Sequence, residues 1–331
     1  MKLLKATSWI LVAILLGSAV PPAAAGKDKK KDVDAIGDRR VARRSIISQE
    51  KEIGIGKQYA SEIDKSAKML TDPVVNEFVN RLAQNVARNS DLTIPLTVKV
   101  IDSPELNAFA LPGGFLYVNS GLIMAADEEA QVAGVVAHEI AHVAARHWAS
   151  QMTKATLLQY AMIPLIFIPM SYPVYYGVME AYLNGVPLAF LKFSRSAEAE
   201  ADMLGLQYMY KAGYDPSAYV SFFSKIIEQD RKSPGSVPTV FASHPPTPER
   251  ILKSEETIKE ILPKREQYLV STSEFEDVKA RLQAVMNLKK AERKEGPTLR
   301  KRETTDQGSA EPAPSEKKQD EDKPPVLRRR D

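Results

Sequence analysis

The sequence predicts an α+β fold that is mainly α, with a helical core and one small β-sheet. Two dipeptides, Asp72-Pro73 and Asp215-Pro216, each pair a capping residue with a proline suited to the first helical position. They predict helices at about 73–89 and 216–230. Strand patterns occur within the short segment 96–118, so the sheet should be a minor part of a helical domain.

The first strand of this sheet is predicted at 96–101, where apolar and polar residues alternate as in a half-buried strand. Residues 109–111 and 115–118 then form a hairpin around the sequence Leu-Pro-Gly-Gly, which places Pro and Gly at the preferred positions of a type II turn. Further along, a capping box at 273–276 predicts a helix that runs to about residue 290.

An Ala- and Val-rich stretch at 130–145, with Asp127 as a capping residue, predicts a buried helix that contains His138-Glu139-Ile-Ala-His142. Residues four apart on a helix differ by about 40° in direction, so both imidazoles can reach one tetrahedral Zn²⁺. Glu139 would lie beside the metal, where its carboxylate can accept a proton from a water. Because a buried, unpaired Glu is costly, a metal site is favoured over a plain pair of core histidines.

Zinc needs at least one more protein ligand, and the best source is an acidic cluster on a later predicted helix. There Glu198 and Asp202 share a face, while Glu200 points about 200° from Glu198 and is expected to be a solvated surface charge. Spacing leaves open which of Glu198 and Asp202 binds the metal and which orients a ligating His. His147, about 140° from His142 on the helical wheel, is expected to face solvent or the opposite packing surface.

Four blocks in this order resemble the HtpX-like and BepA-like zinc metalloendopeptidases, relatives of the CAAX prenyl proteases. The blocks are Asn107-Ala-Phe-Ala-Leu-Pro-Gly-Gly, His138-Glu-x-x-His, Ser194-Arg-x-x-Glu-x-x-x-Asp and Ser243-His-Pro-Pro-Thr-x-x-Arg-Ile. The resemblance covers roughly residues 46–262. It implies a gluzincin-type fold in which His138, His142 and Glu198 hold one Zn²⁺ per chain, Glu139 is the general base and acid, and Asp202 supports a ligating His.

Peptidases of this kind bind the substrate chain along an edge strand beside the zinc helix, by β-augmentation. The candidates in this chain are Asn107, Ala108, Phe109 and Ala110. An ordinary small sheet packed on the helix would leave the same pattern, and both interpretations can hold.

His244 precedes two prolines, so it is predicted to lie in a loop, just before a helix opened by Thr247 and Pro248. A loop His can approach zinc, where it either stabilises an oxyanion or occupies the open ligand position and keeps the enzyme latent. The resemblance repeats this block beside the site, so we expect His244 near the zinc. The alternative is a partly exposed His that packs locally.

Residues 1–25 show the basic start, apolar run and small-residue cleavage pattern of a secretory signal peptide; an uncleaved anchor is the rival interpretation, although the apolar run is short for a span. The absence of Cys excludes lipoprotein-type acylation and disulfides, and the export signal suggests a bacterial periplasm. After the signal we expect a loosely ordered charged linker at 26–45, the zinc metallopeptidase domain at 46–265, a helical extension at 266–290 and a disordered charged tail at 291–331.

Residues 155–179 carry no charge and are long enough to cross a bilayer, but three prolines interrupt them. We expect two short apolar helices that cover the zinc cleft or contact a membrane surface; a buried helix pair is an equal alternative, and a transmembrane hairpin a weaker one. The net charge of +3 is spread too evenly to indicate a nucleic-acid partner.

The resemblance implies a zinc-dependent metalloendopeptidase that hydrolyses peptide bonds of unfolded or misassembled envelope proteins, in protein quality control. Its partners would be polypeptide substrates. The alternative is a chaperone-like envelope assembly factor with a latent zinc site. Glu139 favours the peptidase, because a structural zinc site has no need of a general base.

Overall fold

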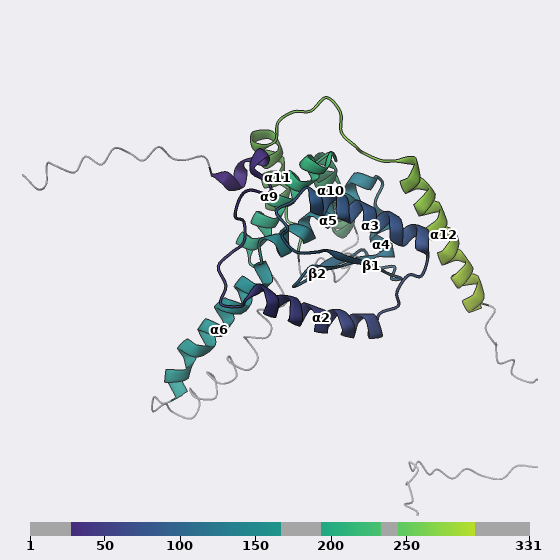
Figure 1. Cartoon of the computed structure of the whole chain (residues 1–331). Coiled ribbons are helices and arrows are strands. Elements are labelled where there is room, and N and C mark those ends of the chain that lie inside the picture. Colours follow the sequence, from purple (N-terminus) through teal and green to yellow (C-terminus); the bar gives the residue numbers. More distant parts are fainter. Residues whose placement is uncertain (1–27, 167–192, 233–243, 295–331) are drawn as a thin grey trace, which may run out of the picture. The chain divides into compact units, whose positions relative to one another are not determined.

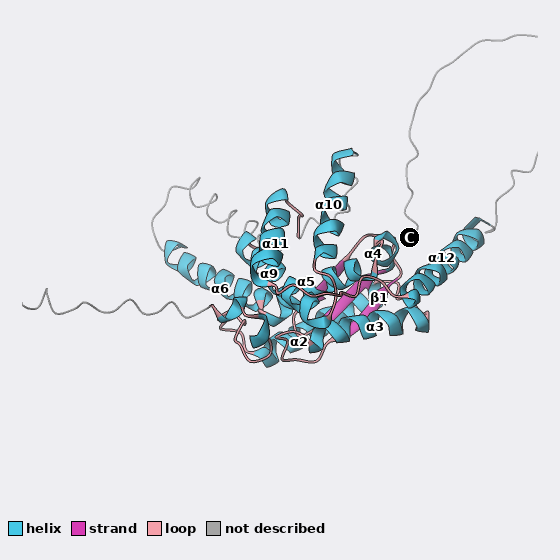
Figure 2. Ribbon diagram, turned by 90° about the horizontal axis from the view of Figure 1, so that it is seen from above, coloured by secondary structure: helices cyan, strands magenta, loops and turns pink. Residues whose placement is uncertain are grey.

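The computed structural model describes residues 28–166, 193–232 and 244–294 (Figure 1). Two short 3-10 helices, η1 (Lys29–Lys31) and η2 (Val33–Ala35), come first. The α-helices within these ranges are α2 (Gln49–Ser66), α3 (Pro73–Arg88), α4 (Ser120–Ala125), α5 (Glu129–Ala144), α6 (His147–Ile166), α9 (Arg195–Ala212), α10 (Ser217–Lys232), α11 (Pro248–Ile261) and α12 (Ser273–Lys294). Helices predominate around one small group of strands, which confirms the mainly helical α+β prediction (Figure 2).

The sheet contains three strands, β1 (Thr97–Ile101), β2 (Ala108–Leu111) and β3 (Phe115–Asn119), in the order β1-β3-β2. Strand β1 runs parallel to β3, and β2 runs antiparallel to it. The predicted hairpin is therefore present, and β2 is an edge strand.

The turn of the hairpin requires glycine at two positions. Gly113 and Gly114 have φ angles of 82° and 86°, in the left-handed region that favours glycine. A Cβ at Gly113 would also lie 2.6 Å from the Cα of Ile53, and one at Gly114 would lie 2.4 Å from the carbonyl oxygen of Pro95. The turn thus packs tightly against α2 and against the segment that leads into β1.

The two faces of the sheet pack on different helices. On one face, Ile101 and Tyr117 pack against Ala60 of α2, and the Tyr117 hydroxyl donates to Asp64 at 3.0 Å. The side chains of the opposite face, such as Leu116, join the main core with α3 and α5. The sheet accordingly lies between α2 and the other helices, which places β2 next to α5 (Figure 1).

Helices α5 and α9 pack closely in the core because Gly205 faces the α5 backbone. A Cβ at position 205 would lie 3.1 Å from the backbone N and 3.2 Å from the Cα of His138. Every residue of α5 is buried, as the apolar sequence predicts. This approach lets side chains from the first half of α9 reach those of α5.

Several helix ends were predicted correctly. Asp72 caps α3 through its side chain, with Pro73 at the start, and Thr247 caps α11 in the same way. Helix α10 begins at Ser217, directly after Pro216. The predicted cap of α5 was wrong: the helix begins at Glu129 after Glu128, which makes no capping hydrogen bond, and Asp127 instead forms an ion pair with Lys225.

The described residues up to Asn287 form one compact unit. The segment predicted as a helical extension packs into the same core: Phe275, Val278 and Leu282 are fully buried there, and the amide of Ala130 at the start of α5 donates to the carbonyl of Val270. The predicted signal peptide (1–25), residues 167–179 of the uncharged stretch and nearly all of the predicted tail lie outside the described residues.

The first part of the uncharged stretch belongs to α6, which begins before it and runs through Ile166. Leu157, Leu158 and Tyr160 of this helix are 54%, 54% and 63% exposed, so this turn is not the buried core helix that one interpretation of the sequence proposed. Among the described residues, none of the helices combines the length and the apolar character that a membrane span requires.

Candidate metal centre

His138 and His142 lie one turn apart on α5, with their rings edge to face and their centroids 4.7 Å apart. Their Nε2 atoms are 3.1 Å apart, and the two residues are 2% and 4% exposed. Two imidazole nitrogens on a tetrahedral zinc ion, each about 2.0–2.1 Å from the metal, would be about 3.3 Å apart. The pair therefore has the separation that one shared zinc ion needs.

Glu198, near the start of α9, supplies the third donor. Its Oε2 lies 3.5 Å from Nε2 of His138, and its Oε1 lies 3.5 Å from Nε2 of His142. Oε2 is buried and accepts no hydrogen bond of normal geometry, although Nη1 of Arg250 lies 3.2 Å from it as an ion pair. Two imidazoles and a carboxylate with an unsatisfied oxygen fit the donor set of a zinc site with an open position.

Asp202, one turn after Glu198, lies behind the histidine pair. Its Oδ1 is 3.0 Å from Nδ1 of His138, the ring nitrogen that points away from the other ligands. The spacing of the two acids left their roles open, and the geometry distinguishes them: Glu198 faces the shared ligand position, while Asp202 can orient His138 by accepting its Nδ1–H.

Charge interactions hold this outer layer in its ionised form. Burial disfavours the aspartate anion, but hydrogen bonds from Arg250 and His138 outweigh burial and lower the pKa of Asp202 to about 2. Burial likewise opposes the charge on His138, yet hydrogen bonds to Asp202 and Glu198 raise the pKa of its imidazole to about 9.

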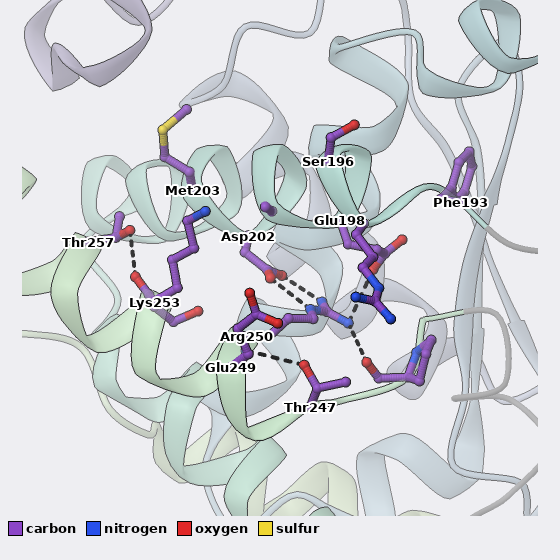
Figure 3. A pocket seen from close by; sticks show the side chains of 14 residues that line it. Phe193, Ser196, Glu198, Asp202, Met203, Thr247, Glu249, Arg250, Lys253 and Thr257 are labelled. Atoms are coloured by element: carbon purple, nitrogen blue, oxygen red, sulfur yellow. Dashed lines mark hydrogen bonds and ion pairs between the residues drawn. The ribbon is translucent and has the colours of Figure 1, made fainter. Parts of the chain in front are cut away.

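Arg250 and Tyr219 contact the candidate site, although the sequence analysis assigned no role to either of them. Arg250, on α11, donates to both oxygens of Asp202, at 2.8 and 2.6 Å (Figure 3). It also donates to the backbone oxygen of His244 at 3.2 Å. The hydroxyl of Tyr219, on α10, donates to Asp202 and lies 3.3 Å from Nδ1 of His138. Arg250 belongs to the last of the four sequence blocks, which could have drawn attention to it. No pattern in the sequence pointed to Tyr219.

Glu139 points toward the edge strand. Its Oε2 accepts a hydrogen bond of 3.0 Å from the backbone N–H of Ala110 in β2, and its Oε1 lies 3.8 Å from Nε2 of His244. The residue is 4% exposed. Its carboxylate thus sits between the ligand cluster and the strand that was predicted to bind substrate.

His244 belongs to the candidate ligand cluster. Its Nδ1 is 2.8 Å from Oε1 of Glu198 and 3.5 Å from Nε2 of His138. The possible ligand atoms of His138, His142, Glu198 and His244 all lie within 4.8 Å of one another, and they form a cluster that could hold a metal ion within the described part of the chain. A fourth protein ligand is therefore within reach of the position that would otherwise remain open.

The prediction for His147 was wrong, because the helical wheel was extended past the end of α5. The helix stops at Ala144, Arg146 adopts a left-handed φ of 53°, and α6 starts in a new direction at His147. His147 is consequently 2% exposed, with its Nδ1 2.9 Å from Nδ1 of His142. It is not a ligand itself, but it contacts one.

The prediction for Glu200 was also wrong. Its side chain is 13% exposed, and it accepts hydrogen bonds from Lys30 and Arg43 at 2.6 Å each, while Nε2 of His147 lies 3.2 Å from its Oε2. Burial favours the neutral acid, but the hydrogen bonds from His147, Lys30 and Arg43 outweigh it and lower the pKa of Glu200 well below its usual range. Glu200 points away from Glu198, as expected, but toward other parts of the protein.

Two recesses adjoin the centre. One lies on the side of Glu139 and His138 and is walled mainly by apolar side chains, among them Leu106, Leu122, Val135 and Phe223. The other opens between α9 and α11, where Glu198, Asp202 and Arg250 line it together with Phe193 and Met203 (Figure 3). The ring of Phe193 stacks on that of His142, with centroids 4.2 Å apart.

Comparison with known proteins agrees with this geometry. The model of peptidase family M48 matches residues 70–258, more than half of the chain. The chain is 28% identical over 284 residues to the beta-barrel assembly-enhancing protease of Escherichia coli (strain K12), covering 84% of this chain and 56% of that protein. The putative beta-barrel assembly-enhancing protease of Vibrio cholerae is 30% identical over 225 residues, 66% of this chain and 46% of that protein.

A eukaryotic relative is the mitochondrial metalloendopeptidase OMA1 of Arabidopsis thaliana, 34% identical over 165 residues, 49% of this chain and 32% of that protein. The chain thus spans about half the length, or less, of these curated relatives. The family match includes all four residues of the ligand cluster. On these grounds the chain belongs to peptidase family M48, a family of metalloendopeptidases.

Proposed function

We propose that this chain is a zinc-dependent metalloendopeptidase that hydrolyses peptide bonds of unfolded or misassembled envelope proteins. The observation that carries the proposal is the position of Glu139, a buried carboxylate between the ligand cluster and an edge strand. His138, His142 and Glu198 would hold the ion. When bound, zinc supplies Lewis acidity, which polarises the scissile carbonyl and lowers the pKa of a water molecule.

Glu139 acts as the general base and then as the general acid. Its carboxylate accepts the proton of the attacking water and passes it to the leaving amine. The hydrogen bond from the amide of Ala110 fixes one of its oxygens, so the other remains directed toward the cluster, where the reaction takes place. Asp202, through its contact with Nδ1 of His138, keeps the Nε2 lone pair of that ligand toward the metal.

The edge strand offers specific backbone groups to an extended substrate. Asn119 donates its N–H to the carbonyl of Asn107, and the register pairs Phe109 with Tyr117. Residues of an antiparallel strand alternate in direction, so the N–H and C=O of Ala108 and Ala110 face away from β3. The N–H and C=O of Ala108 and the C=O of Ala110 are the groups that a substrate strand would pair with, because the N–H of Ala110 donates outward to Glu139.

The apolar recess beside Glu139 gives this proposal a side-chain preference. Its lining is mainly apolar and includes Leu106, Leu122, Val135 and Phe223. Its volume is about 20 Å³, so an apolar residue of the substrate next to the cleaved bond would enter it by moving these side chains apart. Apolar residues are exposed in unfolded chains and buried in folded ones. The recess therefore supports unfolded polypeptides as substrates.

His244 would hold the resting site latent by filling the open ligand position. Its Nδ1 lies within the ligand cluster, and Arg250 binds the backbone oxygens of both His244 and Pro245. This contact favours a second candidate function, a chaperone-like envelope assembly factor whose zinc site stays closed. We favour the peptidase because Glu139 is in place as a base.

The location in the periplasm follows from the predicted signal peptide, and a role in envelope quality control is supported by the similarity to the beta-barrel assembly-enhancing protease of Escherichia coli. We include contact with a membrane surface through residues 155–179 in the proposal, because Leu157, Leu158 and Tyr160 are exposed on α6.

The proposal is tested with the wild type, Glu139→Gln and Glu105→Gln, an exposed acid near the edge strand that serves as control. Zinc content and cleavage of casein are measured for each. We expect equal zinc in all three, cleavage by the wild type and by Glu105→Gln, and a loss of at least about 100-fold in Glu139→Gln. Equal cleavage by Glu139→Gln would contradict the role of Glu139, and a zinc-loaded wild type that never cleaves would favour the assembly factor.

A further inference from the structure

A buried chain of side chains leads from the zinc ligand His142 to a charged group on α9. Nδ1 of His142 lies 2.9 Å from Nδ1 of His147, and Nε2 of His147 lies 3.2 Å from Oε2 of Glu200. The imidazole of His147 is fully buried, and it uses both of its ring nitrogens in this chain. None of these contacts lies on the side of His142 that faces the ligand cluster.

The direction of the hydrogen bonds follows from the carboxylate. An ionised Glu200 can only accept, so Nε2 of His147 donates to it. In the neutral imidazole, Nδ1 of His147 is then an acceptor, and Nδ1 of His142 must be the donor. His142 is thereby held in the tautomer whose Nε2 carries a free lone pair, and this is the atom that faces His138 at 3.1 Å.

Glu200 is in turn positioned by the N-terminal segment Asp28–Ser45, which we call the strap. Lys30 and Arg43 of the strap each donate to Glu200 at 2.6 Å, one to each oxygen. The strap is therefore not the loosely ordered linker that the sequence suggested. Lys30 binds Oε1, while Arg43 shares Oε2 with His147, so both oxygens of the carboxylate are held in place.

Arg39 anchors the strap to the core. Its fully buried side chain forms an ion pair of 2.9 Å with Asp91 and donates to Gln207 at 2.7 Å. Gln207 lies on α9, two turns after Glu200, and donates in return to the backbone oxygen of Lys30. The strap thus contacts α9 at two levels, which keeps Lys30 beside Glu200.

We propose that the strap is a working part of the metal centre: through Glu200 and His147 it positions His142 for zinc. The proposal rests on the zinc site proposed above. It gives both histidine ligands a carboxylate partner, Asp202 directly for His138 and Glu200 through one intervening imidazole for His142. In metal sites such partners fix the ring and its tautomer, and their loss weakens metal binding roughly 10- to 100-fold.

The test measures zinc affinity, by competition with a chromophoric chelator, in the mature chain that includes the strap. Glu200→Gln and His147→Phe should bind zinc roughly 10- to 100-fold more weakly, as should the benchmark Asp202→Asn. Lys30 is the part-exposed end of this series of contacts, so Lys30→Met should lower the zinc affinity roughly two- to fivefold. Lys30→Arg keeps the positive charge and should retain the wild-type zinc affinity. Arg40→Met removes a charge from an exposed position of the same strap and should have no effect.

The outcomes separate this inference from the proposed function. Zinc affinities within twofold of wild type in Glu200→Gln and His147→Phe, alongside a weakened Asp202→Asn, overturn the inference and leave the peptidase intact. An equal loss in Lys30→Met and Arg40→Met overturns the part played by the strap. A wild type that binds no zinc overturns both. Circular dichroism of the zinc-free variants identifies any that fail to fold, and Lys30→Met, a surface change, then decides the question.

Discussion

Replacing Gly205 with Ala tests whether the close packing of α9 on α5 sets the geometry of the metal centre. A Cβ at this position would lie 3.1 Å from the backbone N of His138 and 3.2 Å from its Cα, inside ordinary van der Waals contact. Both atoms belong to a buried helix that cannot rotate away as a side chain can. Helix α9 must therefore shift by roughly a few tenths of an ångström, and Glu198 would move with it.

Two free energies oppose each other in this variant. Glycine to alanine inside a helix favours folding by about 1 kcal/mol, whereas overpacking a core costs about 1–3 kcal/mol. Gly205→Ala should therefore lower the free energy of unfolding by roughly 0–2 kcal/mol. The matched control is Gly54→Ala on the exposed face of α2, where nothing lies within 4 Å of the added Cβ, so that variant should gain about 1 kcal/mol.

Urea unfolding of the zinc-free proteins measures both free energies, and chelator competition measures zinc affinity. The difference between the two variants isolates the overpacking cost and should be about 1–3 kcal/mol. Gly205→Ala should also bind zinc more weakly than Gly54→Ala. If the two variants gain the same stability and bind zinc equally well, the packing of α9 on α5 does not constrain the ligands, and the reasoning is refuted.

Two further predictions concern the loop and the outer carboxylate. If His244 closes the site, His244→Ala should retain zinc and cleave casein faster. If His244 stabilises an oxyanion, the same variant should lose roughly 100-fold or more in kcat. No change in either cleavage or zinc affinity would refute its role. The zinc-free protein should lose stability as the pH falls from about 4 to 2. The reason is Asp202, whose pKa in the folded protein is lowered to about 2. A carboxylate with a lowered folded pKa stabilises the fold above its unfolded pKa, and this stabilisation is lost as the pH falls through the folded pKa. In Asp202→Asn, the fall in the free energy of unfolding over this pH range should be smaller by roughly 2 kcal/mol. The same pH dependence in the variant and the wild type would contradict a charged Asp202.

Sequence reasoning succeeded where the relation between residues lies within one helix. His138, Glu139 and His142 are fixed by the geometry of α5, and Glu198 and Asp202 share one face of α9 as expected. His147 was misplaced because the same geometry was extended beyond Ala144, where the chain turns through the left-handed Arg146. The sequence around Arg146 contains no Gly or Pro that would announce this turn.

The remaining residues could not be assigned because their roles depend on other elements. The helical wheel gives the direction of Glu200 on α9 correctly, but only the folded chain shows that the strap and His147 lie in that direction. Tyr219 and Arg250 reach Asp202 from α10 and α11, and periodicity within those helices says nothing about what they face. Contacts between elements follow from packing, which single-element patterns do not encode.

The candidate ligands come from two helices that are far apart in sequence, α5 and α9, so a bound ion would be a reversible cross-link. A zinc ion held by His142 and Glu198 joins the ends of the long segment between them, and any ion bound only by the folded chain adds its binding free energy to the fold. At free zinc 100 times the dissociation constant, the gain is about 2.7 kcal/mol. The lifetime of the folded protein would then depend on the supply of zinc in its compartment. When zinc is scarce, the protein would be degraded before its loss of catalysis became limiting.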